Sequence, residues 1–238
     1  MITLGIIGSG NIGAAISRLA VSADIPVVIA NSRGPESLGG LITELGPLAR
    51  ASTAEEAAAC GDVVVLSVPL SAHTAIPASL LDGKVVLDTS NYYPFRDGRV
   101  AVLDDEEVTT SELVQQHFQG ARLVKAFSNI LAHHIPLLAR PSGATDRTAL
   151  PVAGDDTEAK DVVRGLLDRP GFDSVDAGPL VDSWRFEPEA AAYTQVYLAD
   201  PNTPADQIMK APAAPTSTAR LVSALEAATR VSVADRTF

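Results

Sequence analysis

The stretch GIIGSGNIG, residues 5–13, constrains the fold of this chain more than any other. Its glycines Gly8, Gly10 and Gly13 follow the spacing GxGxxG, between a short apolar run and a helical pattern over residues 11–20. In that context Gly8 makes a tight turn, Gly10 lets the backbone approach a pyrophosphate, and Gly13 permits close contact between helix and strand. The stretch therefore predicts a dinucleotide-binding β-α-β unit.

The rest of the first 140 residues alternates strand and helix patterns. Apolar runs typical of strands cover residues 2–7, 25–30, 48–52, 62–69 and 84–90. Helical patterns cover residues 11–20, 35–46, 53–60 and 71–81, with Pro35 in a first turn. Such alternation favours a parallel sheet with helices on both faces. We predict an α/β fold with a doubly wound (Rossmann) sheet, forming an NADP-binding domain over residues 1–140.

Residues 141–238 are predicted to form a smaller C-terminal α/β extension with a helical tail. Strand and helix patterns continue over residues 150–156, 157–168, 172–180 and 187–198. Residues 199–217 are rich in Pro and Ala, which predicts an extended linker. The terminal pattern, residues 218–231, is helical, and its apolar side must dock on its own domain or on a partner subunit. That side carries Leu221, Val222, Leu225 and Ala228.

Composition limits the partners and the location. The net charge of −11 argues against nucleic acid and against an anionic membrane surface. No apolar run reaches the roughly 18 residues of a membrane helix, and no basic leader precedes the first strand. A single cysteine, Cys60, permits no internal disulfide and suits a cytoplasmic protein. We expect Cys60 to be a buried packing thiol.

The end of the second predicted strand indicates which dinucleotide binds. A carboxylate at this place holds the two adenosine ribose hydroxyls of NAD. Here the chain has Asn31, Ser32 and Arg33 instead. A hydroxyl and a guanidinium suit the 2′-phosphate of NADP, since Arg can bind a phosphate through two hydrogen bonds. Glu36 offers a ribose ligand one turn into the next helix, where it is badly placed, so NADP is the predicted cofactor.

With these residues, the sequence resembles the coenzyme F-420-dependent NADP oxidoreductases, whose nucleotide domain recurs in the STEAP metalloreductases. The resemblance covers residues 5 to about 180 and is carried by GIIGSGNIG, ANSRGP, VVVLSVP, KVVLDTSN, LVKAFSN, VAGDD and DAGPL. It implies a homodimer and hydride transfer between NADP(H) and a deazaflavin. In the family pattern KAFN the last residue is asparagine, whereas this chain has Ser128 followed by Asn129.

The resemblance also implies roles for particular residues. The pyrophosphate contacts fall on Ser9, Gly10, Asn11 and Ile12. Ser32 and Arg33 hold the 2′-phosphate. Val68, Pro69 and Ala126 lie against the nicotinamide.

The second substrate is expected to be a small molecule with a flat ring. Tyr92, Tyr93 and Phe95 supply aromatic side chains that suit a deazaflavin, and would also suit a flavin or quinone. The candidates for the cleft itself are His73, Ser128 and Asn129. His73 follows the strand end at Pro69, and either contacts the site or serves as a capping or surface residue.

Other polar residues have simpler explanations. His133 and His134 are adjacent and make a poor metal pair, so packing or surface roles are expected. Asp155 with Glu158 matches a helix-capping box, which we prefer to a metal site. Lys125 either meets a substrate anion or extends along the end of its strand.

The sequence thus favours an oxidoreductase that moves a hydride between NADP(H) and a deazaflavin of the coenzyme F-420 type. It needs no strong acid or base, since alignment and exclusion of water do most of the work. The alternatives are an NADPH-dependent reductase of a flavin, quinone or small carbonyl, and a non-catalytic NADP(H)-binding protein.

Overall fold

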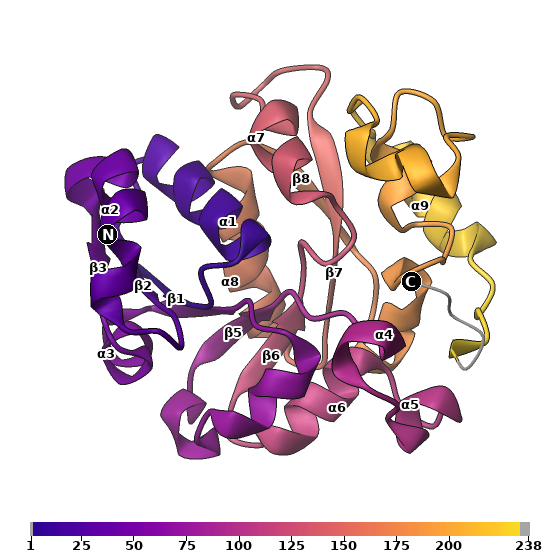
Figure 1. Ribbon diagram of the computed structural model, residues 1–238. Coiled ribbons are helices and arrows are strands. Elements are labelled where there is room, and N and C mark those ends of the chain that lie inside the picture. Colours follow the sequence, from indigo (N-terminus) through magenta and orange to yellow (C-terminus); the bar gives the residue numbers. More distant parts are fainter. Residues whose placement is uncertain (1, 234–238) are drawn as a thin grey trace.

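The computed structural model describes residues 2–233, which form one eight-stranded sheet (Figure 1). The strand order is β3-β2-β1-β4-β5-β6-β7-β8. The strands are β1 (Leu4–Ile7), β2 (Val27–Ala30), β3 (Ala49–Ala51), β4 (Val63–Leu66), β5 (Val85–Asp88), β6 (Arg122–Lys125), β7 (Thr148–Gly154) and β8 (Phe172–Asp176). β1 to β6 are parallel, β7 is antiparallel to β6, and β8 is parallel to β7. The predicted doubly wound α/β fold is confirmed.

The strands are buried on both faces because helices cover each side of the sheet. One face packs against α1 (Asn11–Ser22), α2 (Gly39–Leu45), α7 (Ile135–Leu138) and α8 (Thr157–Asp168). The other packs against α3 (Ala54–Cys60) and α6 (Thr110–His117). Side chains of a strand alternate between the faces, as with Ile6 on the first and Ile7 on the second. This explains the nearly continuous apolar runs in the sequence.

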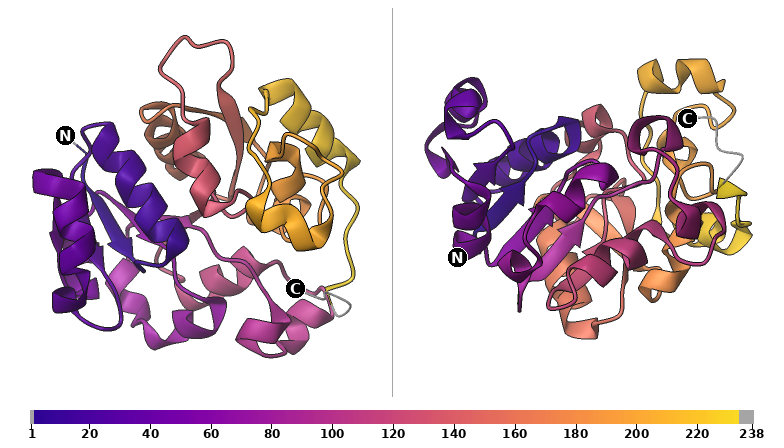
Figure 2. Two further views of the ribbon diagram at one scale, coloured as in Figure 1. Left: turned by 45° about the horizontal axis from the view of Figure 1, so that its top comes forward. Right: turned by 60° about the horizontal axis from the view of Figure 1, so that its bottom comes forward.

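The C-terminal part continues the same sheet. β7 joins β6 through only two residue pairs, Val124 with Gly154 and Lys125 with Ala153. The terminal helix α9 (Thr218–Ala227) buries Leu221 and Leu225 against β7, so its apolar side docks within this chain. Figure 2 shows residues 190–233, in orange to yellow, at the opposite end of the molecule from β3 and α2. The domain boundary at residue 140 stays a prediction.

Three predicted helices differ in the structure. Residues 35–46 divide into a 3-10 helix (Pro35–Leu38) and α2. Residues 71–81 form two 3-10 helices, Leu70–Ala75 and Ala78–Leu81, because Pro77 interrupts the pattern. The helix predicted over 187–198 is wrong: only Thr194–Tyr197 is helical there, as a 3-10 turn.

The segment between β5 and β6 carries two short helices before α6, α4 (Pro94–Asp97) and α5 (Ala101–Asp104). Residues of α4 and of the C-terminal part together line one side of the site described below. The 199–217 linker contains one 3-10 helix, Ala205–Lys210. Within residues 2–233, no helix combines the length and the apolar character needed to cross a bilayer.

The exposure of Cys60 contradicts a further prediction. Cys60 is the last residue of α3 and is exposed, with its Sγ accepting a hydrogen bond from Arg50 Nη2 at 3.1 Å. The buried side of α3 is formed instead by Ala57 and Ala58. The expectation of a buried thiol is therefore wrong.

Candidate functional site

The glycine turn connects β1 to α1 at the carboxyl end of the sheet. Gly8 has φ +112°, and a Cβ at this residue would collide with the carbonyl group of Ser67 at the end of β4. A Cβ at Gly13 would collide with the carbonyl oxygen of Gly8. Both glycines are therefore required by the turn itself and by the close packing of α1 on it.

Gly10 differs from the other two glycines. It is the N-cap residue of α1, and a Cβ built on it would meet no protein atom within 4 Å. No side chain caps the first turn of α1. The free N–H groups and the positive end of this 12-residue helix thus face open space over Gly10. These features fit a pyrophosphate, which would fill the space that a side chain would otherwise take.

Asn31 organises the loop after β2. Its Nδ2 donates to Ser9 Oγ (3.1 Å) and to Ser37 Oγ (2.9 Å), and its Oδ1 accepts from Arg33 N (3.0 Å). Asn31 therefore ties the loop to the glycine turn. Ser32 and Arg33 are exposed beside it, and the Arg33 guanidinium makes no hydrogen bond or ion pair with residues 2–233. It is free to bind an anion.

Two depressions meet at the carboxyl edge of the sheet. The first, the β2 groove, has a volume of about 510 Å³. It is lined by the glycine turn, the loop after β2 and the end of β4, including Gly8, Ser9, Gly10, Asn31, Ser32, Arg33, Ser67, Val68 and Pro69. The second, the β5 cleft, has a volume of about 570 Å³. The two share Gly10, Ser67, Val68 and Pro69, so they form one continuous channel.

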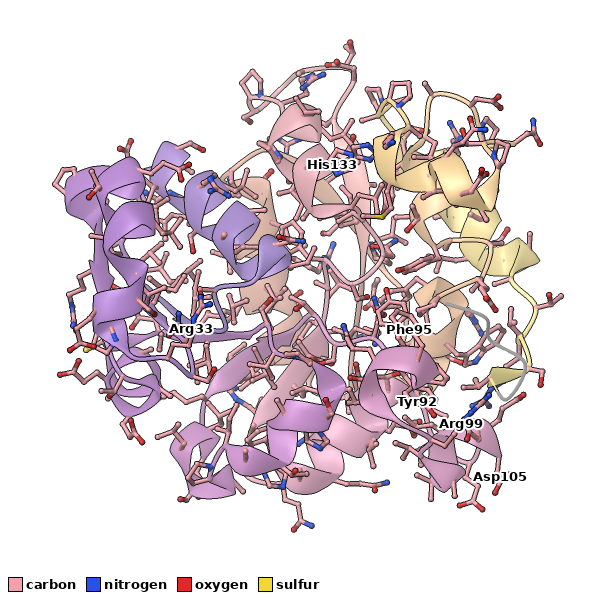
Figure 3. All side chains as sticks on the ribbon, in the orientation of Figure 1. Arg33, Tyr92, Phe95, Arg99, Asp105 and His133 are labelled. Atoms are coloured by element: carbon pink, nitrogen blue, oxygen red, sulfur yellow. The ribbon has the colours of Figure 1, made fainter. Side chains whose placement is uncertain are left out.

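The β5 cleft has a polar floor and an aromatic rim. Ser90 and Asn91 after β5, and Ser128 after β6, line the cleft together with Asn11, Ile12, Phe127, Tyr93, Phe95, Tyr193 and Met209. Phe95 is 74% exposed and Met209 is 66% exposed. Figure 3 shows Phe95 on the α4 side of the molecule and Arg33 toward its N-terminal half. The channel thus runs from a cationic end to an apolar, aromatic end.

Two contacts hold this rim. The hydroxyl groups of Tyr93 and Tyr193 are 2.5 Å apart, which links the segment after β5 to the C-terminal part. The Arg96 guanidinium lies over the Tyr93 ring, 4.8 Å from its centroid, and its Nη2 donates to the Asn91 carbonyl at 2.9 Å. Such a stacked, hydrogen-bonded arrangement fixes one wall of the cleft.

The backbone is strained where the floor of the cleft is formed. Phe127 has φ +58°, a conformation that bulky residues rarely adopt. Its ring is buried against Phe172, with the centroids 5.8 Å apart. This packing holds the conformation that directs the next residue, Ser128, to the cleft.

Some predicted site residues do not line the channel. His73 is buried between His117 and Phe118, and its Nδ1 bonds the Leu70 carbonyl. The structure therefore places it in the packing of the sheet face below the channel. Ala126 is fully buried in the core on the other face. Gly13 acts within the turn and does not line either depression.

Asn129 and Tyr92 also point elsewhere. Asn129 Nδ2 donates to the Ala192 carbonyl (2.7 Å) and to Tyr197 Oη (3.0 Å), so it joins β6 to the C-terminal part. The Tyr92 hydroxyl donates to Asp104 Oδ1 at 2.9 Å. Tyr92 is fully buried, whereas Tyr93 and Phe95 line the cleft as predicted. Alternation of side chains along an extended backbone separates these neighbours.

Lys125 lies beneath the floor of the cleft and does not line it. Its fully buried Nζ donates to the Ser90 carbonyl (2.9 Å) and Ser111 Oγ (3.0 Å), and forms an ion pair with Glu187 Oε1 at 3.2 Å. Ser111 Oγ in turn donates to Asp88 Oδ2 at 2.6 Å. Neither of the two roles expected for Lys125 applies: it is a buried structural cation.

The remaining candidates have structural roles. Asp156, rather than Asp155, caps α8 by accepting from Ala159 N at 2.9 Å, and Asp155 Oδ1 accepts from Leu180 N at 2.9 Å. The predicted capping role is thus right in kind and wrong by one residue. His134 is buried and its Nε2 bonds the Ala211 carbonyl at 2.9 Å. In the described part of the chain, no group of three or more His, Cys, Asp or Glu residues is placed to hold a metal.

The cleft residues that the sequence did not indicate include Ser90, Asn91, Tyr193 and Met209. Ser90 and Asn91 lie two and three residues beyond the end of β5, and the rule that ligands bind at the carboxyl ends of parallel strands would have found them. Tyr193 and Met209 carry no local signal, since only tertiary packing brings them to the cleft.

This sheet order, glycine turn and channel define the class: a dinucleotide-binding oxidoreductase fold. Residues 3–92 match the model of a family described as NADP oxidoreductase, coenzyme F420-dependent. The chain belongs to this family of NADP oxidoreductases.

Two curated proteins are similar in sequence. Metalloreductase STEAP3 of Rattus norvegicus is 30% identical over 187 residues, which cover 77% of this chain and 35% of that protein. Putative protein YjhV of Escherichia coli (strain K12) is 40% identical over 53 residues, 22% of this chain and 39% of that protein. The chain thus spans well under half the length of either protein.

Solved structures share the fold. Hypothetical protein SMa0349 from Sinorhizobium meliloti has a TM-score of 0.70 and 32% identity, covering 80% of this chain and 92% of its own. A putative F420-dependent NADP reductase from Arthrobacter sp. FB24 has a TM-score of 0.64 and 23% identity, covering 77% and 87% of the two chains. At that identity the second likeness concerns the fold alone.

Proposed function

We propose that this chain transfers a hydride between NADP(H) and a deazaflavin of the coenzyme F-420 type. The observation that carries the proposal is the continuous channel, with the free guanidinium of Arg33 at one end and an aromatic cleft large enough for a ring at the other. Family membership supports the NADP half of the proposal. The acceptor is our inference from the shape and the lining of the β5 cleft.

At the cofactor end, each group has a separate task. The N–H groups after Gly10 hold the pyrophosphate, together with Ser9, Asn11 and Ile12. Arg33 and Ser32 hold the 2′-phosphate, and Asn31 keeps their loop in position through Ser9 and Ser37. Val68 and Pro69, which line both depressions, cover the nicotinamide end.

At the acceptor end, the chain orients a ring and excludes water. Tyr93, Phe95 and Tyr193 present flat apolar surfaces, and Met209 adds an adaptable side chain. NADPH, when bound, supplies the hydride. The protein's contribution is alignment of two rings in a site with little water, which requires no acid or base among the cleft residues.

The test is an acceptor panel. NADPH oxidation is followed at 340 nm with a deazaflavin, a flavin, a quinone and a small carbonyl, at equal NADPH concentration. We expect the highest kcat/KM with the deazaflavin. A higher value with any other acceptor contradicts the deazaflavin assignment, and tight NADPH binding without turnover of any acceptor contradicts the enzyme assignment.

The proposed homodimer is tested separately, by the mass of the protein in solution at the concentrations used for the assays.

A further inference from the structure

Three buried polar atoms in the floor of the β5 cleft have no hydrogen-bond partner among residues 2–233. They are Ser90 Oγ, Asn91 Oδ1 and Ser128 Oγ. Their residues are 2%, 8% and 5% exposed, and all three line the cleft. Most buried polar atoms in folded proteins are paired, since an unpaired one costs free energy. Three in one place point to a ligand that pairs them.

The backbone around these atoms is already fixed. Ser90 N donates to Asp88 Oδ1 (3.0 Å), and the Ser90 carbonyl accepts from Lys125 Nζ (2.9 Å). Asn91 Nδ2 donates to the Ser128 carbonyl at 2.6 Å, which joins the two strand ends. These bonds occupy the neighbouring peptide groups and leave the two hydroxyls and the Asn91 carboxamide oxygen available. The backbone of Ser90 and Ser128 and the carboxamide of Asn91 are therefore held in place before a ligand binds, while the two serine hydroxyls rotate.

We propose that Ser90, Asn91 and Ser128 recognise a cyclic imide, the carbonyl–NH–carbonyl edge of the ring acceptor. Two hydroxyls can donate to the two carbonyls, while the Asn91 Oδ1 accepts from the N–H between them. Deazaflavins and flavins have this edge, whereas a quinone has carbonyls without the N–H. This proposal rests on the proposed function and makes these residues determinants of acceptor specificity.

The position of the three residues in the sheet favours the acceptor over the cofactor. The loops after β2, β1 and β4 form the β2 groove, while Ser90, Asn91 and Ser128 follow β5 and β6, further along the sheet. Rotation about χ1, a fast motion, turns each serine hydroxyl toward the cleft. The carboxamide of nicotinamide is the competing partner, because it too carries an N–H and a carbonyl.

The test uses Ser90→Ala, Ser128→Ala and the double variant. Ser183→Ala is the matched control, because Ser183 Oγ is also buried and unpartnered but Ser183 does not line the cleft. Measured are the melting temperature, NADP⁺ affinity by titration, deazaflavin affinity by fluorescence, and NADPH turnover. A deazaflavin methylated on the imide nitrogen serves as the second ligand.

We expect each single cleft variant to weaken deazaflavin binding about tenfold, the effect of one lost hydrogen bond, with NADP⁺ affinity unchanged. The melting temperature should be unchanged or higher, since no protein contact is lost. Methylation of the imide should weaken binding to the unmodified protein and to the double variant alike, because both keep Asn91 Oδ1 as the acceptor for the imide N–H. The control should match the unmodified protein throughout.

Three results would overturn the inference. Equal loss of NADP⁺ affinity would assign the cluster to the nicotinamide carboxamide. A lower melting temperature in the cleft variants but not in Ser183→Ala would make the hydroxyls structural. Undiminished binding of the methylated ligand would exclude an imide contact. Since the affinities are measured without turnover, they remain informative if the protein binds a deazaflavin and fails to reduce it, an outcome that contradicts the proposed function alone.

Discussion

Arg33 presents a guanidinium without a competing partner in the described part of the chain, so nothing has to be broken before it binds a phosphate. Replacing Arg33 by Ala should weaken NADPH binding about 10- to 100-fold, the roughly 1.5–3 kcal/mol of a charge-assisted hydrogen bond. NADH, which lacks the 2′-phosphate, should bind almost as before. Fluorescence titration with both nucleotides measures the difference, and equal losses for the two would refute the role of Arg33.

The sequence indicates the position of a site residue where a motif fixes the backbone and not where burial decides, and the binding roles stay predictions. Ser32, Arg33 and Ser128 lie on the channel because each follows the carboxyl end of a strand. Asn129 is only one residue further than Ser128, yet its side chain bonds the C-terminal part. The sequence does not reveal that the positive φ of Phe127 turns the chain at this point.

At the scale of an element, the turn before α1 separates a folding role from a binding role. Gly13→Ala should destabilise the protein by about 1–3 kcal/mol, because its Cβ collides with the Gly8 carbonyl. Gly10→Ala should cost at most about 1 kcal/mol, the difference between Gly and Ala at an N-cap, but should abolish tight NADPH binding. Thermal unfolding and nucleotide titration of the two variants check this. Equal stability and equal affinity would contradict it.

His134, the last residue of the 3-10 turn before α7, should make the stability of the fold depend on pH. Burial lowers the pKa of His134 below its usual value of 6.5, with a smaller contribution from the neighbouring His133. The folded state thus favours neutral His134, so stability is fully present above about pH 6.5 and declines as the pH falls below it.

Melting temperatures measured from pH 7.5 to 5.5 test this expectation. His134→Gln should flatten the decline, because an amide can still donate to the Ala211 carbonyl but does not titrate. The exposed neighbour supplies the control, and His133→Gln should keep most of the slope, because His133 makes only the smaller contribution. The same slope in His134→Gln would show that another group causes the decline.

Strands and helices were predictable from the sequence where their hydrophobic pattern is simple. The strands β1, β2, β4 and β5 are short, apolar and rich in β-branched residues, so their presence and order along the chain follow from the sequence. Residues 71–81 have the apolar content of a helix, but Pro77 and the small residues leave only 3-10 turns there. The helix expected over 187–198 fails because Glu189 and Thr194 adopt positive φ, which ends any regular turn.

At the scale of the whole molecule, the ion pair of Lys125 and Glu187 joins the nucleotide-binding part to the C-terminal part. Lys125→Met removes the buried cation of the ion pair with Glu187 and should destabilise the protein by about 3–5 kcal/mol. Adding Glu187→Gln should restore most of that loss, because Gln keeps an oxygen for the Thr110 N–H. Urea unfolding of both single variants and the double variant provides the measurement. No recovery in the double variant would contradict this account.

The path of the chain beyond β6 was the least predictable feature. Its strand and helix patterns continue those of the first half, yet β7 enters the sheet antiparallel. Local sequence does not encode that reversal, which depends on how β7, β8 and α9 pack together. The predicted boundary at residue 140 therefore separates two stretches that share one sheet.

The meeting of Tyr93 with Tyr193 has a consequence for how such a protein can diversify. In our proposal the nucleotide is bound by residues in the first third of the chain, whereas one side of the opposite cleft is formed by Tyr193, a hundred residues after Tyr93. Exchange of the stretch that holds Tyr193 and Met209 would change the lining of the proposed acceptor cleft. It would leave the proposed phosphate ligands in the β2 groove intact. A chain built in this way can change its redox acceptor through replacement of one C-terminal segment, while its nucleotide-binding residues stay the same.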